Sequence, residues 1–469
     1  MNKKDEQMRR KVHYVIKPDD GSYAFLGLRP GSYTLRIQAA GLRAVLAKEI
    51  ALTVGQKADL SFRLEISPVM EAVEVLSNTH LLEARRTSVA TTIVEVLIKN
   101  LPSESRGALQ FGLLDSAVSR ENQSSLPPIP ATGLNVDGQQ MRANMVTIDG
   151  ADAVDNTING VRVTIPQDAV QEFILLKSGY EAEFGRSSGA SINIVSRSGT
   201  NRFQGDVFGL LRSRNLSATN AFAGEPDPGD TNTQAGFTFG GPLRKDDLFF
   251  FAAFDTVQTN SIGISTIGQD NYGLRGLSSS FSSVPLLVTD QQAKFIQSAP
   301  APLAIPYATI ANQASRTALY GNTPGGPTTF ALTSNPLPIS FRGLTAEAGN
   351  YKRTEDSYVH STRIDKRLSN AHTLFARFGF NSSDSRGRSS NSQTQIDAQN
   401  SFSRTNNLFV RDLSLSSQLT SSLSPTWLNE FRFQFGRRGL GLTTNGSSVA
   451  IEISGAASIG TEPFAPADR

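Results

Sequence analysis

The sequence predicts a mainly β protein that combines a partial β-sandwich, a mixed α/β domain and the first strands of an antiparallel transmembrane β-barrel. Three observations favour this fold class. Short alternating runs between Gly and Pro turns fill residues 21–66, and longer amphipathic runs of about 10 residues, the length of a tilted membrane strand, follow residue 202. The connections between the later runs are alternately short and long, which is typical of a membrane barrel.

Composition narrows the classes of function. The 469 residues suggest at least two domains, and 45 Lys and Arg against 42 Asp and Glu give no indication of nucleic-acid binding. The absence of cysteine excludes disulfides, thiolate metal sites and cysteine nucleophiles. No apolar run reaches the ~18 residues of a membrane helix. The start "MNKKDEQMRRKVHYVIK" lacks the apolar core of a secretory signal, so we expect a fragment whose true start lies upstream.

We assign residues 1–66 to the partial sandwich. "DGSYAFLGLRPGSYTLRIQAAGL" alternates around Tyr23 and Phe25, turns at Pro30-Gly31, and alternates again over 33–37. "IALTV" and "ADLSFRLEI" predict two further short strands. About four strands are few for a closed sandwich, so we expect its first strands to be missing.

Residues 67–84 read as a connector and residues 85–201 as the mixed α/β domain. Within the latter, "VEVLIKNLP" predicts a short strand or helix that ends before Pro102. "MVTIDGADAVDN" predicts a strand over 145–148 that stops at the Asp149-Gly150 turn. "PQDAVQEFILLKSGY" predicts a helix start at Pro166, a turn near Val170 and a strand over 172–177.

Residues 202–469 predict about seven barrel strands, near 203–213, 235–242, 247–256, 356–368, 372–381, 406–419 and 426–437. The last shows the pattern best, with Trp427 and Phe431 on one face and Arg432 and Gln434 on the other. "PLRKD", "LSNA" and "SSLSP" are short connections, whereas 214–233, 257–354 and 382–405 are long. A soluble sandwich has no reason to place every long loop at one end, so the barrel is favoured over it.

Several stretches, in order along nearly the whole chain, resemble the Oar-like TonB-dependent outer-membrane receptors. They include "MEAVEVLSN", "LNVDGQQMRANMVTIDGADAVDN", "QDAVQEFILLKSGYEAEFGRSSGASINIVSRSGTNRFQGDVFGLLRS" and "FTFGGPLRKDDLFFFAAFD". Residues 21–35 resemble the carboxypeptidase regulatory-like domain, an Ig-like sandwich with a carbohydrate-binding-like fold. The resemblance implies a bacterial outer-membrane protein with the sandwich and a plug domain, residues 85–201, on the periplasmic side. It also implies a barrel usually of about 22 strands, of which 202–469 would be a truncated N-terminal part.

The resemblance implies TonB, outer-membrane lipid and an unknown solute as partners, with no nucleic acid and no cofactor. The candidate TonB-coupling segment resembles the E-x-V-x-V type found near the coupling box; its residues are Met70, Glu71, Val73, Glu74, Val75 and Leu76. Its expected role is strand addition, in which an extended, unpaired segment joins the edge of a TonB sheet. An ordinary interdomain strand is the alternative.

The plug contains eight candidate structural or gating residues. They are Asp149, Gly150, Glu172, Tyr180, Glu183, Gly185, Arg186 and Gly189. We expect Glu183 and Arg186 to make charge-assisted contacts with the plug or the inner barrel wall, holding the lumen shut. "YEAEFGRSSGA" reads as a tight turn near the end of the plug. Its last strand contains Ile192 and Ile194, and "SGTN" leads into the wall at Phe203.

Nothing in the sequence favours an enzyme or a metal site. The histidines, His13, His80, His360 and His372, lie in no G-x-S-x-G or H-E-x-x-H setting. Asp149, Asp152, Asp155 and Asn156 do not alternate as calcium ligands do.

The aromatic residues 249–251 and Trp427 fit a lipid-facing girdle better than a ligand-stacking platform. The predicted function is a receptor that, when complete, imports a large or scarce solute such as a glycan, a peptide or a metal chelate. Two alternatives stay open: an outer-membrane adhesion or scaffold protein without transport, and a secreted carbohydrate-binding sandwich protein.

Overall fold

The computed structural model consists mainly of β-strands. It describes residues 15–16, 23–25, 28, 31–39, 41–53, 56, 58–66, 73–76, 88–101, 106–120, 133–155, 161–162, 164–181, 184–213, 216, 231–265, 349–389, 401–424, 427–446, 449–453, 457–461 and 467–468. Of the predicted residues, Met70, Glu71, His13, His80 and Glu183 lie outside this set.

Two small sheets precede residue 77. Strands β1 (Val15–Ile16) and β2 (Tyr23–Ala24) pair with each other, and β3 (Gly31–Ile37), β4 (Val45–Leu52) and β5 (Val73–Leu76) form a sheet in the order β3-β4-β5. The pairing of β5 with β4 corrects the expectation of an unpaired candidate coupling segment, although the predicted extended conformation is present. The predicted strand over "ADLSFRLEI" is wrong: residues 58–65 pair with no strand, and only Leu42 and Ile66 form an isolated bridge there.

Residues 88–201 form what we call the inner domain. Its five-stranded sheet has the order β10-β9-β12-β11-β6, with β9 and β12 parallel and the other pairs antiparallel. These strands are β6 (Val89–Val94), β9 (Met145–Ile148), β10 (Ala151–Asp152), β11 (Val170–Ser178) and β12 (Ser191–Ser196). Helix α1 (Glu95–Asn100), the 3-10 helices at Ala108–Leu114, Met141–Ala143 and Gln167–Ala169, and the paired strands β7 (Val118–Arg120) and β8 (Leu134–Val136) complete it.

The hydrophobic core of the inner domain also includes Phe251 and Ala253 from one of the later long strands. Phe173 and Leu175 of β11 and Ile192 and Ile194 of β12 are buried there, and the ring of Phe111 meets that of Phe173 edge-on. The predicted strand over 145–148 is confirmed, and the strand predicted over 172–177 extends to Val170–Ser178. The helix predicted at Pro166 is a single 3-10 turn, because β11 begins directly after it.

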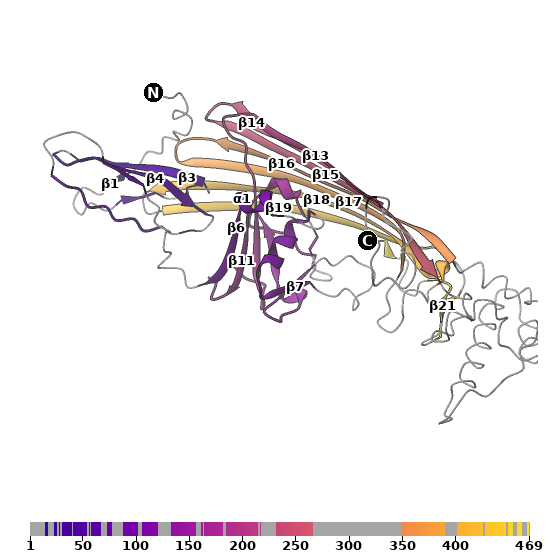
Figure 1. The fold of residues 1–469 in the computed structure, drawn as a ribbon. Coiled ribbons are helices and arrows are strands. Elements are labelled where there is room, and N and C mark those ends of the chain that lie inside the picture. The colour runs from indigo at the N-terminus through magenta and orange to yellow at the C-terminus, as the bar shows by residue number, and fades with distance from the viewer. Residues whose placement is uncertain are drawn as a thin grey trace, which may run out of the picture.

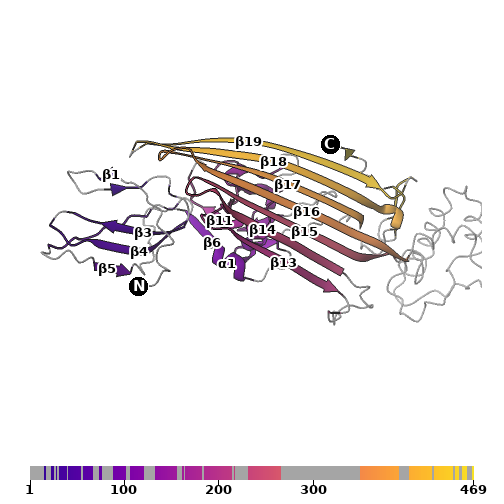
Figure 2. The ribbon, with the colours of Figure 1, turned by 90° about the horizontal axis from the view of Figure 1, so that it is seen from above.

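The long strands form what we call the wall sheet, in the order β13-β14-β15-β16-β17-β18-β19-β22 with all pairs antiparallel. They are β13 (Gln204–Ser213), β14 (Thr231–Arg244), β15 (Leu248–Ser265), β16 (Gly349–Arg367), β17 (His372–Ser389), β18 (Thr405–Ser424), β19 (Trp427–Thr444) and β22 (Ala467–Asp468). A separate hairpin joins β20 (Ile451–Ile453) to β21 (Ala457–Ile459). Figure 2 shows the long strands side by side in chain order.

All seven predicted barrel strands are present, but most were predicted too short. Strands β15 to β19 contain 18 to 20 residues each. Strand β14 extends into the predicted loop 214–233, β15 and β16 into 257–354, and β17 and β18 into 382–405. The far half of β17, Asn381–Ser389, is polar on both faces, yet it pairs with β18 through most of its length. Where both faces of a strand are polar, hydrophobic alternation no longer marks the strand, and the sequence then resembles a loop.

The two faces of the wall sheet carry different aromatic residues. Trp427, Phe431, Phe433 and Phe435 are exposed on the outer face, as a lipid-facing girdle requires. The prediction for Phe251 was wrong, because its side chain is only 5% exposed and lies under the guanidinium of Arg197 from the inner domain.

The inner domain lies against one face of the curved wall sheet (Figure 1). Strand β13 runs away from the end of the sheet beyond which β3, β4 and β5 lie (Figure 2). The short connections 245–247, 368–371 and 425–426 are at that same end, because β13 begins there and the following strands alternate in direction. In the described residues, no helix has the length and apolar character needed to cross a membrane.

Candidate functional site: the contact between the inner domain and the wall sheet

Asp149 is the centre of the contact between the two units. It directly follows β9 and has a φ of 53°, a left-handed conformation that Asp tolerates better than most residues. Its carboxylate is fixed within the inner domain by Ser196, whose backbone N donates to Oδ1 at 2.8 Å and whose Oγ donates to Oδ2 at 2.7 Å. The turn therefore holds a buried carboxylate toward the wall sheet in a defined orientation.

Two wall arginines bind this carboxylate. Arg363 Nη1 of β16 donates to Asp149 Oδ1 at 3.1 Å, and Arg377 Nε of β17 donates to Oδ2 at 2.9 Å. Arg363 and Arg377 are directly opposite each other across two paired strands, where like charges repel. Asp149 supplies a negative charge between them. The charges of the two wall arginines are therefore compensated in part by the inner domain.

The remaining groups of Arg363 are also paired. Its Nε and Nη2 each donate at 3.1 Å to one oxygen of Asp365, which is fully buried, and its guanidinium lies 4.2 Å from the ring centroid of Phe375. Two arginines and two aspartates therefore form a charge-balanced cluster, which limits the cost of burying four ions.

Burial alone would raise the pKa of Asp149. The guanidiniums of Arg363 and Arg377 and the hydrogen bonds from Ser196 outweigh burial, so the pKa lies below the ordinary value of an aspartate. The carboxylate is thus ionised at neutral pH and can hold both arginines.

A second contact lies a few residues further along the chain. Arg438 of β19 donates through Nη1 to Asp155 Oδ2 at 2.8 Å and holds Asp412 of β18 through Nε and Nη2 at 2.9 and 3.0 Å. Gln434 of β19 accepts from the backbone N of Asp152 at 2.8 Å and donates to the carbonyl of the same residue. The loop after β9 is therefore bound to β16, β17 and β19.

Glycines on both sides of the contact allow this loop and the wall to approach each other closely. A Cβ at Gly436 of β19 would lie 2.5 Å from Arg162 Nη2. A Cβ at Gly150, where φ is 76°, would lie 3.3 Å from the guanidinium of Arg432. Glycine at these positions permits guanidinium groups to lie directly on the backbone.

The candidate residues of the turn at 180–190 have roles within the inner domain. Arg186 has a φ of 58° and forms an ion pair with Asp152, inside the inner domain. The hydroxyl of Tyr180 lies 2.9 Å from Ser187 Oγ and donates to the carbonyl of Gly189 at 3.0 Å. These contacts close the turn upon itself.

The three remaining candidates differ in how closely they are packed. A Cβ at Gly189 would lie 2.4 Å from Asn144 Oδ1, whereas a Cβ at Gly185 would meet nothing within 4 Å. Glu172 is buried in β11, at a register position between Val94 and Val195.

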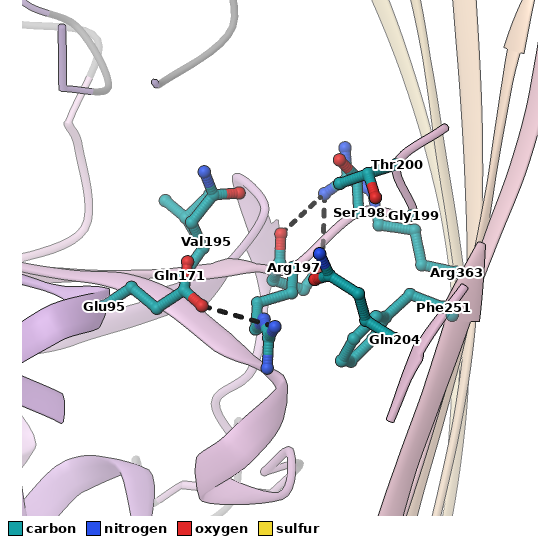
Figure 3. A pocket seen from close by; sticks show the side chains of 12 residues that line it. Glu95, Gln171, Val195, Arg197, Ser198, Gly199, Thr200, Gln204, Phe251 and Arg363 are labelled. Carbon is teal, nitrogen blue, oxygen red and sulfur yellow. Dashed lines mark hydrogen bonds and ion pairs between the residues drawn. The ribbon is translucent and has the colours of Figure 1, made fainter. Parts of the chain in front are cut away.

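A cavity of about 160 Å³ lies where the inner domain continues into the wall. Figure 3 shows Glu95 and Arg197 on its inner-domain side and Phe251 and Arg363 on its wall side. Arg197 Nη2 pairs with Glu95 at 3.3 Å, and Nη1 donates to the carbonyl of Asp168 at 3.0 Å. Gly199 passes so close to the wall that a Cβ there would lie 2.3 Å from the carbonyl oxygen of Phe250.

The two histidines in the described part of the chain, His360 and His372, each contact a hydroxyl group. His360 Nε2 lies 2.9 Å from Thr362 Oγ1, and His372 Nδ1 lies 2.8 Å from Ser421 Oγ. Within the described residues, no group of three or more His, Asp and Glu side chains is placed to hold a metal ion.

Sequence reasoning selected Asp149 but missed Arg363, Arg377 and Arg438. The available signal was an arginine on the strand face opposite the aromatic residues, since such a position points toward the interior. Alternation of Leu374, Phe378 and Phe380 with Arg377 along 373–381 places this arginine on that face. It could not show that the partner is an aspartate more than 200 positions earlier in the chain.

Comparison with known proteins agrees with this architecture. The family model of an outer membrane beta barrel domain matches residues 195–467, more than half of the chain. The TonB-dependent transporter Oar of Myxococcus xanthus is 28% identical over 253 residues, which cover 51% of this chain and 23% of that protein. The chain thus spans about a quarter of the length of this curated relative.

Two solved structures of outer-membrane proteins illustrate the structural similarity. The outer membrane transporter YddB from Escherichia coli has 12% identity and a TM-score of 0.46, with 79% of this chain and 43% of that chain covered. A mutant of the ferric enterobactin receptor PfeA from Pseudomonas aeruginosa has 13% identity and a TM-score of 0.46, with 82% and 45% covered.

The matched family model spans the whole wall sheet except for its last residue, and the curated relative is a transporter rather than an enzyme. This chain belongs to the outer membrane beta barrel domain family and is a bacterial outer-membrane homologue of the TonB-dependent transporter Oar.

Proposed function

We propose that the chain is the N-terminal part of a TonB-dependent receptor that imports a large or scarce solute, such as a glycan, a peptide or a metal chelate. In this proposal residues 1–66 are a sandwich domain, 67–84 a connector, 85–201 the plug and 202–469 the first part of the barrel wall. The observation that carries it is the Asp149 cluster, in which an inner domain is bound to a barrel wall through ions.

Further strands are part of the proposal. The first and last members of the described wall sheet, β13 and β22, are not paired with each other, so these strands leave the sheet open. The matched part of the chain corresponds to 23% of the Oar protein. We propose that additional strands of a longer protein close the wall around the inner domain.

The contact chemistry suits a plug that must move. Asp149, Asp155 and the backbone of Asp152 contact the wall through hydrogen bonds and ion pairs. In a lumen that admits water, each of these groups can exchange its partner for water as the plug moves. The contact also has an apolar part, where Phe251 and Ala253 of β15 belong to the core of the inner domain and water offers no such replacement.

Energy would reach the plug mechanically through the segment Met70–Leu76, because the outer membrane has no nucleotide supply. The coupling test uses the full-length protein in detergent and the purified periplasmic domain of TonB as the probe. Deletion of residues 70–76 should abolish TonB binding, while deletion of an equal length within 121–132 should leave it unchanged. Equal binding by both deletions would contradict coupling through this segment.

A second test concerns the gate. In cells that make the full-length protein, Arg186→Glu should break the ion pair with Asp152 and increase sensitivity to vancomycin, which is too large for ordinary pores. Arg212→Glu, outside the contact described above, is the control. Unchanged vancomycin sensitivity in Arg186→Glu would remove Arg186 from the gate. If the wild-type protein also fails to bind TonB, an adhesion or scaffold role replaces transport.

A further inference from the structure

Exposed arginines of three neighbouring strands lie on the outer face of the wall sheet, at the end away from the short connections. They are Arg386 of β17, Arg411 of β18 and Arg437 of β19. Arg437 continues the alternation of the exposed Phe433 and Phe435 and therefore shares their outward face. Arg411 is directly opposite Gly439, and opposed residues of paired strands lie on one face of a sheet.

The spacing along β19 places Arg437 at the boundary of the membrane. Trp427 begins this strand at the short connection 425–426, and its side chain is 70% exposed. Arg437 follows about ten positions later, which at about 3.3 Å per residue and a tilt of about 45° is a rise of roughly 23 Å. The apolar band of an outer-membrane barrel is about 25 Å tall, and its short turns face the periplasm. With Trp427 at the periplasmic boundary, Arg437 lies level with the headgroups of the outer leaflet.

Arg411 lies between small side chains. The residues directly opposite it are Ser382 of β17 and Gly439 of β19, and a Cβ at Gly439 would lie 3.9 Å from the Cβ of Arg411. Arg437 is the diagonal neighbour of Arg411 on the same face. Diagonal neighbours are about 7–8 Å apart, which long side chains can span. The two guanidiniums can therefore contact the same group.

The two arginines also differ from Arg386 in their pairing. The Nε and Nη2 atoms of Arg386 donate to the two oxygens of Asp384 at 3.1 and 2.8 Å. Within the described residues, the guanidiniums of Arg411 and Arg437 have no carboxylate partner. Their positive charges are thus available to an anion from outside the chain.

Apolar side chains lie on the membrane side of these arginines. The next outward positions in β17, β18 and β19 form a continuous apolar surface, with Phe378, Leu415 and Phe435 each at least 40% exposed. Phe380 and Leu413 lie in register with Arg437, directly above that row. A ligand that fits both parts of this surface has an anionic head and apolar chains.

We propose that Arg411 and Arg437 form a site for the phosphate group of an outer-leaflet lipid, whose acyl chains lie along the apolar rows of β17, β18 and β19. Guanidiniums bind phosphate oxygens through paired charge-assisted hydrogen bonds, and basic side chains at a membrane surface bind anionic headgroups. A lipid suits this place better than a soluble solute, because the site faces away from the lumen. The site would serve a transporter and an adhesion protein alike.

A lipid-binding measurement tests the site. The probe is fluorescent lipid A with two phosphate groups, mixed into nonionic detergent micelles with the full-length protein and followed by fluorescence anisotropy. Arg411→Gln combined with Arg437→Gln should weaken binding by at least about tenfold, because charge-assisted hydrogen bonds to phosphate are lost. Arg202→Gln combined with Lys245→Gln removes two exposed cations near the opposite end of the wall and should leave binding unchanged. An unchanged thermal midpoint confirms that each variant is folded.

Two further probes identify the ligand group. Lipid A without its phosphates should bind the wild type and the Arg411, Arg437 double variant equally, whereas an equal loss with both lipids would mean that the arginines do not contact phosphate. Inorganic phosphate should not displace the lipid, and full displacement would assign the arginines to a soluble anion. Wild-type affinity of the double variant for lipid A, or the same loss in the two control substitutions, would overturn the proposal.

Discussion

Asp149→Asn should detach the inner domain from the wall while leaving its fold intact. The amide keeps an oxygen that can accept from the backbone N of Ser196, and it has nearly the same volume as the carboxylate. The substitution removes the negative charge that lies between Arg363 and Arg377, which face each other across paired strands. Arg363 keeps Asp365 as a partner, but Arg377 loses its ionic partner while it stays 2% exposed.

The size of the effect follows from burial. Removal of one member of a buried ion pair costs about 3–5 kcal/mol, because it leaves an uncompensated charge. The side chains of Asp149 and Arg377 are 3% and 2% exposed, so solvent screens this pair little. Retained hydrogen bonds favour the lower value, about 3 kcal/mol, which corresponds to a roughly 100-fold larger population of detached inner domain.

Hydrogen exchange on the purified protein measures that population. Peptides covering 145–155 include amides that bond to Gln434 of the wall and to β12 of the inner domain. We expect exchange of the Asp152 amide, which bonds to Gln434, to rise about 100-fold in Asp149→Asn, in line with the free energy above, while the amides bonded to β12 keep their protection. Asp384→Asn is the control, since its ion pair with Arg386 is partly exposed and lies outside the contact between the inner domain and the wall. Equal exchange in wild type and Asp149→Asn would refute the reasoning.

Three further predictions concern stability. The hydrogen bond from Thr91 lowers the pKa of Asp115 in the folded protein. The ionised carboxylate therefore stabilises the fold above the ordinary pKa of about 4, and this stabilisation is lost as the pH falls through the lower pKa of the folded state. When the urea midpoint of unfolding is plotted against pH, Asp115→Asn should show a smaller decrease at acid pH than the wild type. Gly199→Ala should lower the thermal midpoint, at a cost of about 1–3 kcal/mol, because the added Cβ meets a backbone oxygen, while Gly185→Ala should have no effect; equal midpoints would contradict the close approach. In urea unfolding of the protein in detergent, Phe251→Ala should lower the free energy of unfolding by about 3–5 kcal/mol, and Phe433→Ala should lower it far less. Similar losses in the two variants would mean that Phe251 does not face the inner domain.

Much of the fold was predictable because alternation and turn chemistry are local signals. The strand at 145–148, its Asp-Gly stop and all seven wall strands follow from residues within a few positions of one another. The far half of β17 was not predictable, since its pairing depends on β18 rather than on an apolar face. The missing strand at 58–65 shows the converse: alternation is present, but the described chain offers it no adjacent strand.

The site was harder to predict than the fold. Asp149 is marked by its turn, and Gly150 by the positive φ that such a turn needs. Their partners Arg363 and Arg377 lie on the paired strands β16 and β17, more than 200 positions later in the chain, and no local signal shows that these strands lie against Asp149. Phe251 was assigned to the wrong face because three consecutive phenylalanines give no alternation to read.

The length of the wall strands determines how far the wall extends beyond the membrane. A strand of 18 to 20 residues, at about 3.3 Å per residue and a tilt of about 45°, rises roughly 40 Å along the membrane normal, whereas the apolar band of an outer-membrane barrel is about 25 Å tall. The excess lies on the side of the long loops, because the short turns are at the other end. In the proposed receptor, this end of the wall therefore extends beyond the lipid as a collar, which places the long loops away from the headgroups.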